Sequence, residues 1–314
     1  HISWKEHTMN YIEIVSEIIA LMIYIAIGYI IRKLKLITEN GIHDISRIIV
    51  NVAMPTLLFS SMLIDYKTEY IKNMGIIALM AMLYLIFTSV TSKQLAWRLT
   101  EKDSERKSIR YSMIFGNIAF LAFPLCEALF GKLGVFYASI FVIVQNIFQW
   151  TVGVNIFKQE KIRLSNLKNL ISPGIVAIIS GLICFSLNIK PPAILDKVIK
   201  GISGISIPLA LMMTGAQLYG YKIGDIIANR KVQIITLVKT LAFPVIFLAI
   251  VYYIPIDNML TYIVAIQAAG PVQASATAFS RNFNGDPTIV AKVVFLSTLC
   301  CLVTIPLFVM LVNL

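Results

Sequence analysis

Side-chain amides interrupt the apolar stretches of this sequence at several points, and among its residues they have the clearest capacity to bind a ligand. An amide can donate hydrogen bonds to a carboxylate and accept one from a hydroxyl group. A set of converging amides would therefore hold a small polar anion without a full counter-charge. Such residues also join helices to one another inside membranes, so that interpretation stays open for each amide taken singly. The residues concerned are Asn51, Asn117, Gln145, Asn146, Gln267 and Gln273, with the hydroxyl of Ser275 close to the last.

Glycine and proline interrupt two apolar segments next to these amides, Gly116 and Pro124 in the first and Gly270 and Pro271 in the second. Proline removes one backbone N–H and displaces the carbonyl four residues earlier, and inside a bilayer that carbonyl needs a partner or a cavity. The N-terminal ends of half-helices carry unpaired N–H groups and partial positive charge, which suits an anion. Discontinuous helices at matching places in two halves of a chain indicate a substrate site. Two ordinary proline kinks are the alternative.

One cation lies deep in an apolar segment. Lys239 is eight residues past Lys231, which is about 12 Å farther along a helix. Its side chain could extend back to the aqueous boundary. It could instead act as the counter-charge for an anion or as a proton-coupled group. Lys239 and Gln267 are therefore the candidates for residues that would couple the movement of a ligand to that of a proton or sodium ion.

Residues for enzymatic or metal chemistry are few. His43 is the one histidine after the first eight residues, and no HExxH motif or deep pair of acidic residues is present. The cysteines Cys126, Cys184, Cys300 and Cys301 lack the spacing of metal or redox sites. We therefore expect neither an enzyme nor a bound metal or cofactor. Coupling to protons or to sodium is left open.

The composition indicates a membrane protein. Of the 314 residues, 58% are hydrophobic and 14% charged, whereas soluble domains average about 45–50% and about 25%. One soluble core would not hide that much apolar surface. The net charge of +11 is then a signal of topology rather than of nucleic-acid binding. Windows of about 20 apolar residues predict ten membrane-spanning helices over 13–31, 42–63, 73–92, 109–130, 134–156, 171–188, 198–218, 232–254, 259–280 and 288–313.

Basic residues indicate how these spans are oriented. Lys and Arg concentrate in the connections that follow odd-numbered spans, most clearly between Lys93 and Arg110. Cytoplasmic loops carry such an excess, so these connections should face the cytoplasm and both termini should lie outside a plasma membrane. His1–Thr8 precede Met9 and look like a remnant of an expression vector.

Two pairs of helix-breaking sites share one offset along the chain. Pro55 and Pro208 are 153 residues apart, and so are Asn117 and Gly270. The offset predicts two repeats of five spans, and an odd number of spans inverts the second repeat in the membrane. Chance placement of Gly and Pro, which are common in membrane helices, is the alternative. The predicted units are residues 9–156, a cytoplasmic linker over 157–170, and residues 171–314.

Several short motifs follow one another in order along the chain. They are Val52-Ala53-Met54-Pro55, Gly116-Asn117, Gln145-Asn146, Lys239-Thr240-Leu241 and Asp286-Pro287. Together they make residues 40–313 resemble the auxin efflux carrier family, which includes plant PIN exporters and bacterial malate and malonate permeases. The resemblance implies an all-α protein of ten helices in two inverted repeats, with broken helices 4 and 9 crossing. It also implies elevator-like transport against a scaffold of helices 1, 2, 6 and 7.

The resemblance assigns roles to some residues and narrows the substrate. It implies that Asn117 and Gln145 contact the substrate carboxylate, and that residues near Asn51 face it from the scaffold. Plant exporters have Asn-Pro at both crossings, whereas Ile118 follows Asn117 here and the second crossing reads Gly-Pro. The long hydrophilic loop of many plant members is absent as well. A small organic acid is therefore favoured over auxin.

We thus predict a secondary transporter of small organic anions, such as malate or related carboxylates, with its site between broken helices 4 and 9. The expected partners are the substrate and the lipid bilayer, with a homodimer as a further expectation and no nucleic acid. One alternative is a sodium-coupled symporter of organic anions, like the related bile-acid symporters. Gln267 and Gln273 would then hold sodium, although no acidic residue lies at the breaks to complete that site. The other alternative is a membrane sensor that does not transport.

Overall fold

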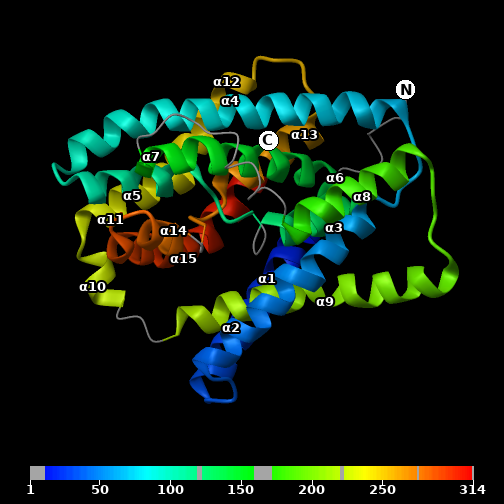
Figure 1. Ribbon diagram of the computed structural model, residues 1–314, viewed down its shortest axis with the longest axis horizontal. Coiled ribbons are helices and arrows are strands. Elements are labelled where there is room, and N and C mark those ends of the chain that lie inside the picture. Colours follow the sequence, from blue (N-terminus) through cyan, green and yellow to red (C-terminus); the bar gives the residue numbers. More distant parts are fainter. Residues whose placement is uncertain (1–10, 119–121, 159–171, 220–222, 274–275, 313–314) are drawn as a thin grey trace.

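The computed structural model describes residues 11–118, 122–158, 172–219, 223–273 and 276–312, in which every regular element is helical (Figure 1). Six helical stretches in these ranges are long and apolar enough to cross a membrane. They are Glu39–Met62, Thr68–Leu99, Phe123–Lys158, Ala193–Leu218, Arg230–Val251 and Pro287–Ile305, with the shorter apolar helices Pro173–Ser186 and Asn258–Ala269 beside them. The prediction of an all-helical membrane protein is confirmed, and the arrangement of ten spans in two inverted repeats stays a prediction.

The described helices follow one another along the chain from α1 to α15 (Figure 1). The α-helices are α1 Tyr11–Lys33, α2 Glu39–Ile48, α3 Met54–Met62, α4 Thr68–Leu99, α5 Asp103–Ile114, α6 Phe123–Phe148, α7 Val154–Lys158, α8 Pro173–Ser186, α9 Ala193–Leu218, α10 Ile223–Ile227, α11 Arg230–Leu237, α12 Phe243–Val251, α13 Asn258–Ala269, α14 Ala276–Asn282 and α15 Pro287–Val312. π-Helical turns whose bounds lie within the described residues connect neighbouring helices at η2 Ile49–Ala53, η4 Gln149–Gly153 and η6 Val238–Ala242.

Local sequence explains where several helices begin. Thr38 precedes α2, and its hydroxyl accepts a hydrogen bond from the N–H of Gly41 at 3.0 Å. Asp257 precedes α13, and its carboxylate accepts one from Met259 at 2.8 Å. Such caps satisfy backbone N–H groups that have no partner within the helix. These helix starts are therefore set by residues next to them in the chain.

Proline accounts for two of the π-helical turns. Pro55 follows η2, and Pro244 follows η6. Each proline lacks the N–H that would bond the carbonyl four residues earlier, so the α-helical hydrogen-bond pattern is interrupted there. A π-turn takes up this mismatch, and such turns are frequent at functional sites. The two turns hold the polar residues Asn51 and Lys239, respectively.

One group of helices, α1, α3, α8 and α9, occupies the lower and right-hand parts of Figure 1. α1 packs along α9, and α3 packs against both α8 and α9. Gly28 on α1 and Gly215 on α9 come so close to the facing backbone that an added Cβ atom would overlap the carbonyl groups of Met212 and Ile25. Small residues permit this close approach of membrane helices. The contact between α1 and α9 therefore depends on glycine.

A second group of helices is built around α4, which packs against α5 and α6. α11, α13 and α15 complete it, and α6 and α15 also contact the first group. Within α6, Gly131 has a φ of 59° and interrupts the helix. Gly131 lies between the expected spans 109–130 and 134–156, so these two spans fall on either side of the interruption. The helix interruptions next to the candidate amides lie in this second group.

Candidate functional site

Two interrupted helices cross each other in the second group. An extended segment follows α5 over residues 115–117, and another follows α13 over residues 270–273. The two segments run antiparallel and meet at Gly116 and Val272. The breaks expected beside Asn117 and at Gly270-Pro271 thus lie against each other. Their backbone hydrogen bonds run from Asn117 N to Pro271 O at 2.6 Å and from Gln273 N to Phe115 O at 3.3 Å.

Glycine on both segments makes the close crossing feasible. A Cβ atom at Gly116 would lie 3.4 Å from Nζ of Lys239 and 3.6 Å from the carbonyl oxygen of Gly270. A Cβ atom at Gly270 would lie 3.2 Å from the carbonyl oxygen of Gln267. Both glycines are therefore surrounded by polar atoms of the crossing. Any side chain at either position would reduce the space beside these atoms.

Two side chains from neighbouring helices hold the crossing segments. Nε2 of the buried Gln145, on α6, donates to the carbonyl of Gly116 at 2.9 Å. The hydroxyl of Ser297, on α15, accepts a hydrogen bond from the N–H of Val272 at 3.0 Å. Backbone groups that would be left unpaired by the helix breaks are thereby satisfied. Gln145 positions the first segment, and its contact with a substrate stays a prediction.

A buried ammonium group lies beside the crossing. Nζ of Lys239 is 3.4 Å from Oη of Tyr84 and 3.4 Å from the carbonyl oxygen of Ala268, to which Tyr84 also donates at 3.0 Å. The thiol of Cys301 donates to the next carbonyl, that of Ala269, at 3.2 Å. These carbonyls end α13, where a helix carries partial negative charge. Lys239 is 1% exposed, so its side chain does not extend to the aqueous boundary.

The charge of Lys239 has no acidic partner in the described part of the chain, since no carboxylate there forms an ion pair with it. Its contacts are neutral oxygens and the face of the Tyr84 ring, 5.5 Å from Nζ. A buried charge without a counter-charge is costly. The crossing therefore has an uncompensated positive charge, which favours an anion.

Unsatisfied amide atoms accompany this charge. Gln267 is 1% exposed, and neither its amide nitrogen nor its amide oxygen has a hydrogen-bond partner among the described residues. The amide oxygen of Gln273 is also buried there without one. Buried polar groups are nearly always paired, so such exceptions call for an explanation. Both residues flank the second break and could donate to, or accept from, a polar ligand.

Some of the other predicted site residues lie at or near the helix breaks, and others form hydrogen bonds within their own helices. Asn117, at the first break, is half-buried, while Pro124 and Pro271 are buried. By contrast, the amides of Asn51 and Asn146 are used within their own helices. They donate to the carbonyls of Arg47 and Val142 at 2.8 Å and 2.9 Å. Ser275 lies outside the described residues. The crossing thus brings together Gly116, Asn117, Gln145, Lys239, Gln267, Gly270, Pro271 and Gln273.

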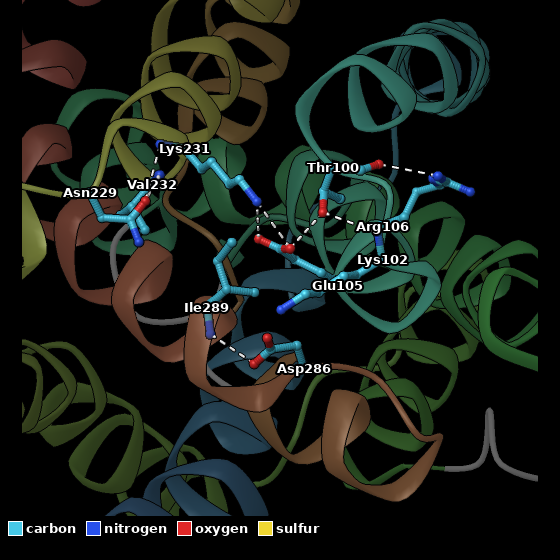
Figure 2. A network of polar contacts seen from close by, with 9 residues as sticks. All are labelled: Thr100, Lys102, Glu105, Arg106, Asn229, Lys231, Val232, Asp286 and Ile289. Atoms are coloured by element: carbon cyan, nitrogen blue, oxygen red, sulfur yellow. Dashed lines mark hydrogen bonds and ion pairs between the residues drawn. The ribbon is translucent and has the colours of Figure 1, made fainter.

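A second polar network joins helix ends away from the crossing (Figure 2). Glu105, on α5, is paired with Lys231, on α11, at 2.9 Å and accepts a hydrogen bond from the hydroxyl of Thr100 at 2.6 Å. Asn229 caps α11, and Asp286 caps the start of α15. Burial alone would raise the pKa of Glu105, but the hydrogen bonds from Thr100 and Lys231 outweigh it and lower the pKa below its usual value. The network holds α4, α5 and α11 together.

Tyr84, Ser297 and Glu105 were not among the predicted site residues. Tyr84 lies in an apolar run, and it is 155 residues from Lys239 in the chain. No spacing rule relates positions so far apart. Glu105 could have been noticed, because it is an acidic residue inside the most basic connection of the chain.

The fold and the crossing define a multi-pass, all-helical membrane protein with a buried polar site. A profile of the family described as membrane transport protein matches residues 13–309. The chain therefore belongs to this family, which is the auxin efflux carrier family.

Two relatives carry the description of transporter. One, an uncharacterized transporter of Methanothermobacter thermautotrophicus, is 21% identical over 298 residues, which cover 93% of this chain and 96% of that protein. The other, an uncharacterized transporter of Methanocaldococcus jannaschii, is 23% identical over 210 residues, covering 64% of this chain and 68% of that protein. The similarity to the first extends along nearly the whole of both chains.

Proposed function

We propose that this protein is a secondary transporter of small organic anions, such as malate or a related carboxylate, and that the anion binds at the helix crossing. The observation that carries the proposal is the ammonium of Lys239. It is buried, it has no carboxylate partner among the described residues, and it lies next to the two helix breaks. A carboxylate would neutralise this charge and offer hydrogen-bond partners to the amides of Gln267 and Gln273.

The proposed architecture is two inverted repeats of five spans. The offset of 153 residues relates Asn117 to Gly270, and these positions flank the antiparallel bridge between Gly116 and Val272. Two segments related by a two-fold axis cross in an antiparallel way, as these do. The observed crossing supports inverted repeats and a substrate site where they meet.

The proposed mechanism is an elevator-like movement of one group of helices against the other. α1, α3, α8 and α9 pack mainly against one another and against α2 and η2, and they contact the second group of helices through α6 and α15. They correspond to the scaffold spans that the family resemblance implies. The crossing lies in the other group, so the bound anion would travel with that group and meet each side of the membrane in turn.

Coupling to sodium is the alternative to be separated from this proposal. The ammonium of Lys239 already donates a hydrogen bond to the carbonyl of Ala268, near the end of α13. A sodium ion at the same place would be repelled by that ammonium. We therefore expect binding of the organic anion to be independent of sodium, which is the behaviour of a uniporter or of a proton-coupled transporter.

Transport and stability assays test the proposal together. Purified protein is heated with dicarboxylates, monocarboxylates and indole acids, each in sodium and in choline buffer, and is reconstituted to measure uptake of labelled acids. A ligand at 100 times its dissociation constant adds about 2.7 kcal/mol of stability. Stabilisation and uptake of one class of acid in both buffers is expected. Absence of both for every acid would contradict the proposal, and a requirement for sodium would favour the symporter.

Asn117→Ala provides the matched test of the crossing. Loss of a hydrogen bond to a charged group costs about 1.5–3 kcal/mol, which weakens binding by roughly tenfold or more. Asn258→Ala is the control, because Asn258 is exposed at the opposite end of α13. Equal affinity of the two variants for the acid would remove Asn117 from the site.

A further inference from the structure

A recess at the end of α4 gathers basic side chains and is separate from the helix crossing. Its volume is about 400 Å³. Its charged lining comes from α4 and α5, while Val152, Asn155 and Ile156 of the segment η4–α7 line the rest of it. We call this pocket the basic recess. The residues that α4 and α5 contribute to it are Lys93, Trp97, Asp103, Arg106, Lys107 and Arg110.

The positive charge of the basic recess is only partly compensated. Asp103 is its one carboxylate, and it is paired with Lys107 at 2.6 Å. Lys93 and Arg110 form no ion pair with any described residue, and Nε of Arg110 is buried without a hydrogen-bond partner there. A partly desolvated guanidinium without a counter-charge, with an unpaired ammonium beside it, indicates an anionic ligand. A phosphate group matches the planar donors of arginine especially well.

Arg106 is held in place at the rim. Its Nη2 donates to the carbonyls of Thr100 and Glu101 at 3.1 Å each. Its guanidinium lies 3.6 Å from the centre of the Trp97 ring. Nε of Arg106 is nonetheless buried without a hydrogen-bond partner among the described residues. The recess therefore presents a fixed guanidinium with donor capacity still unused.

The shape of the surroundings favours a lipid over a free ion. A neighbouring groove along α4 shares Lys93 and Trp97 with the basic recess and continues to Ser89 and Val90. Val90 lies seven residues before Trp97, which is about 10 Å farther along the helix toward the middle of this apolar span. Val90 and Trp97 are 59% and 60% exposed, respectively. An apolar extension thus leads away from the charged pocket along the surface of a membrane-spanning helix.

Two general properties of membranes agree with this arrangement. Tryptophan is enriched where a helix leaves the hydrocarbon region, which suits Trp97 near the end of α4. Basic pockets between membrane helices on the cytoplasmic side bind anionic headgroups. The excess of Lys and Arg around Lys93–Arg110 predicts that this end of α4 faces the cytoplasm.

We infer that the basic recess binds the phosphate of an anionic phospholipid from the cytoplasmic leaflet, with an acyl chain lying along the α4 groove. Arg106 and Arg110 would donate to the phosphate oxygens, and Lys93 would add charge at the entrance. The headgroup would contact α4 and α5, and it would also face Val152 and Ile156 of the segment η4–α7. The lipid would therefore hold α4, α5 and the segment η4–α7 together. The inference does not depend on which anion the protein transports.

Fluorescence quenching by brominated lipids tests the inference directly. The intact protein is reconstituted in mixed vesicles of phosphatidylcholine and phosphatidylglycerol, in which either one or the other lipid carries brominated chains. The Trp97→Phe protein gives the background of Trp4 and Trp150, so the difference reports on Trp97. We expect brominated phosphatidylglycerol to quench Trp97 more than its share of the lipid would produce. Equal quenching by the two brominated lipids at matched fractions would overturn the inference.

A pair of variants with equal net charge separates a specific site from general attraction to an anionic surface. Lys93→Gln with Arg110→Gln should abolish the preference for phosphatidylglycerol. Lys72→Gln with Lys197→Gln alters two exposed lysines elsewhere and should keep it. A preference that survives in the first variant would contradict the inference. If the double variant does not fold, Lys93→Gln alone is used, because Lys93 is exposed. This single change should lower the preference for phosphatidylglycerol by half or more.

Competition separates a lipid from a free phosphate. Inorganic phosphate or glycerol phosphate is added at rising concentration at constant ionic strength, and the quenching by brominated phosphatidylglycerol is followed. We expect little displacement, because neither ion occupies the α4 groove. Complete displacement by either one at concentrations comparable to that of the lipid would show a phosphate site without lipid selectivity and would overturn the inference.

Discussion

Tyr84 and Lys239 both donate hydrogen bonds to the C-terminal end of α13. Both are buried, and both reach the carbonyl of Ala268. One is a neutral donor and the other a cation, so they differ in what they offer to a ligand. Tyr84 should contribute chiefly to stability, whereas Lys239 should contribute chiefly to the binding of an anion.

Tyr84→Phe separates these contributions. The change removes the hydrogen bond to Ala268 and a partner of Lys239, which should lower the free energy of unfolding by about 0.5–1.5 kcal/mol. Thermal unfolding in detergent measures the loss. Tyr253→Phe is the control, because Tyr253 is 85% exposed. If the two variants unfold at the same temperature, the hydrogen bond of Tyr84 contributes nothing measurable.

Glu105 should make stability depend on pH. Its pKa is lower in the folded protein than the ordinary value of 4.5, so its stabilising contribution is present above that value and is lost as the pH falls through the folded pKa. Glu105→Gln should therefore be less stable than the parent protein at neutral pH, with a difference that shrinks as the pH falls below 4.5. Unfolding measured across this range tests the prediction, and a difference that does not change with pH would contradict it.

At the scale of elements, helix starts and helix interruptions are the features that local sequence explains best. Pro55 and Pro244 account for the π-turns that precede them, and Thr38 and Asp257 account for helix starts. The contact between α1 and α9 is different, since glycine is needed there because of a partner distant in the chain. Sequence alone does not reveal which glycines have that role.

Two glycines of α9 give a matched test of this contact. Gly215→Ala places a Cβ atom against the backbone of α1, and overpacking of this kind costs about 1–3 kcal/mol. Gly204→Ala places one where no atom lies within 4 Å, and it should stabilise the helix by roughly 0.5–1 kcal/mol. Thermal unfolding of both variants measures the difference. Equal effects of the two changes would show that α1 and α9 are not in close contact.

For the whole molecule, composition was sufficient to predict an all-helical membrane protein, and the short motifs were sufficient to predict the family. The boundaries were less predictable, because hydropathy windows report how apolar a stretch is and not where a helix begins or ends. The window 73–92 covers only part of α4, Thr68–Leu99, whereas the gap between the windows 109–130 and 134–156 falls at Gly131, where α6 is interrupted. The contacts of Lys239 with Tyr84, or of Gln145 with Gly116, depend on tertiary packing and follow from no sequence pattern.

The predicted orientation can be tested on whole cells. Lys197 and Lys102 are both exposed, and they lie in regions that the distribution of basic residues assigns to opposite sides. In a variant without the native cysteines, Lys197→Cys should react with an impermeant thiol reagent added outside, and Lys102→Cys only after the membrane is opened. The reverse pattern would invert the topology and move the basic recess to the outer leaflet.

Direct binding of a labelled carboxylate to the parent protein and to Lys239→Gln is the measurement that tests the central claim most directly. The acid is one identified by thermal stabilisation, Lys197→Gln serves as the control for charge, and Lys239→Arg keeps the cation if the neutral variant unfolds. Removal of a buried hydrogen-bonded charge that faces a carboxylate should weaken binding by roughly tenfold or more, with Lys197→Gln unchanged. Equal affinity of folded Lys239→Gln and the parent protein would contradict an anion site at the helix crossing.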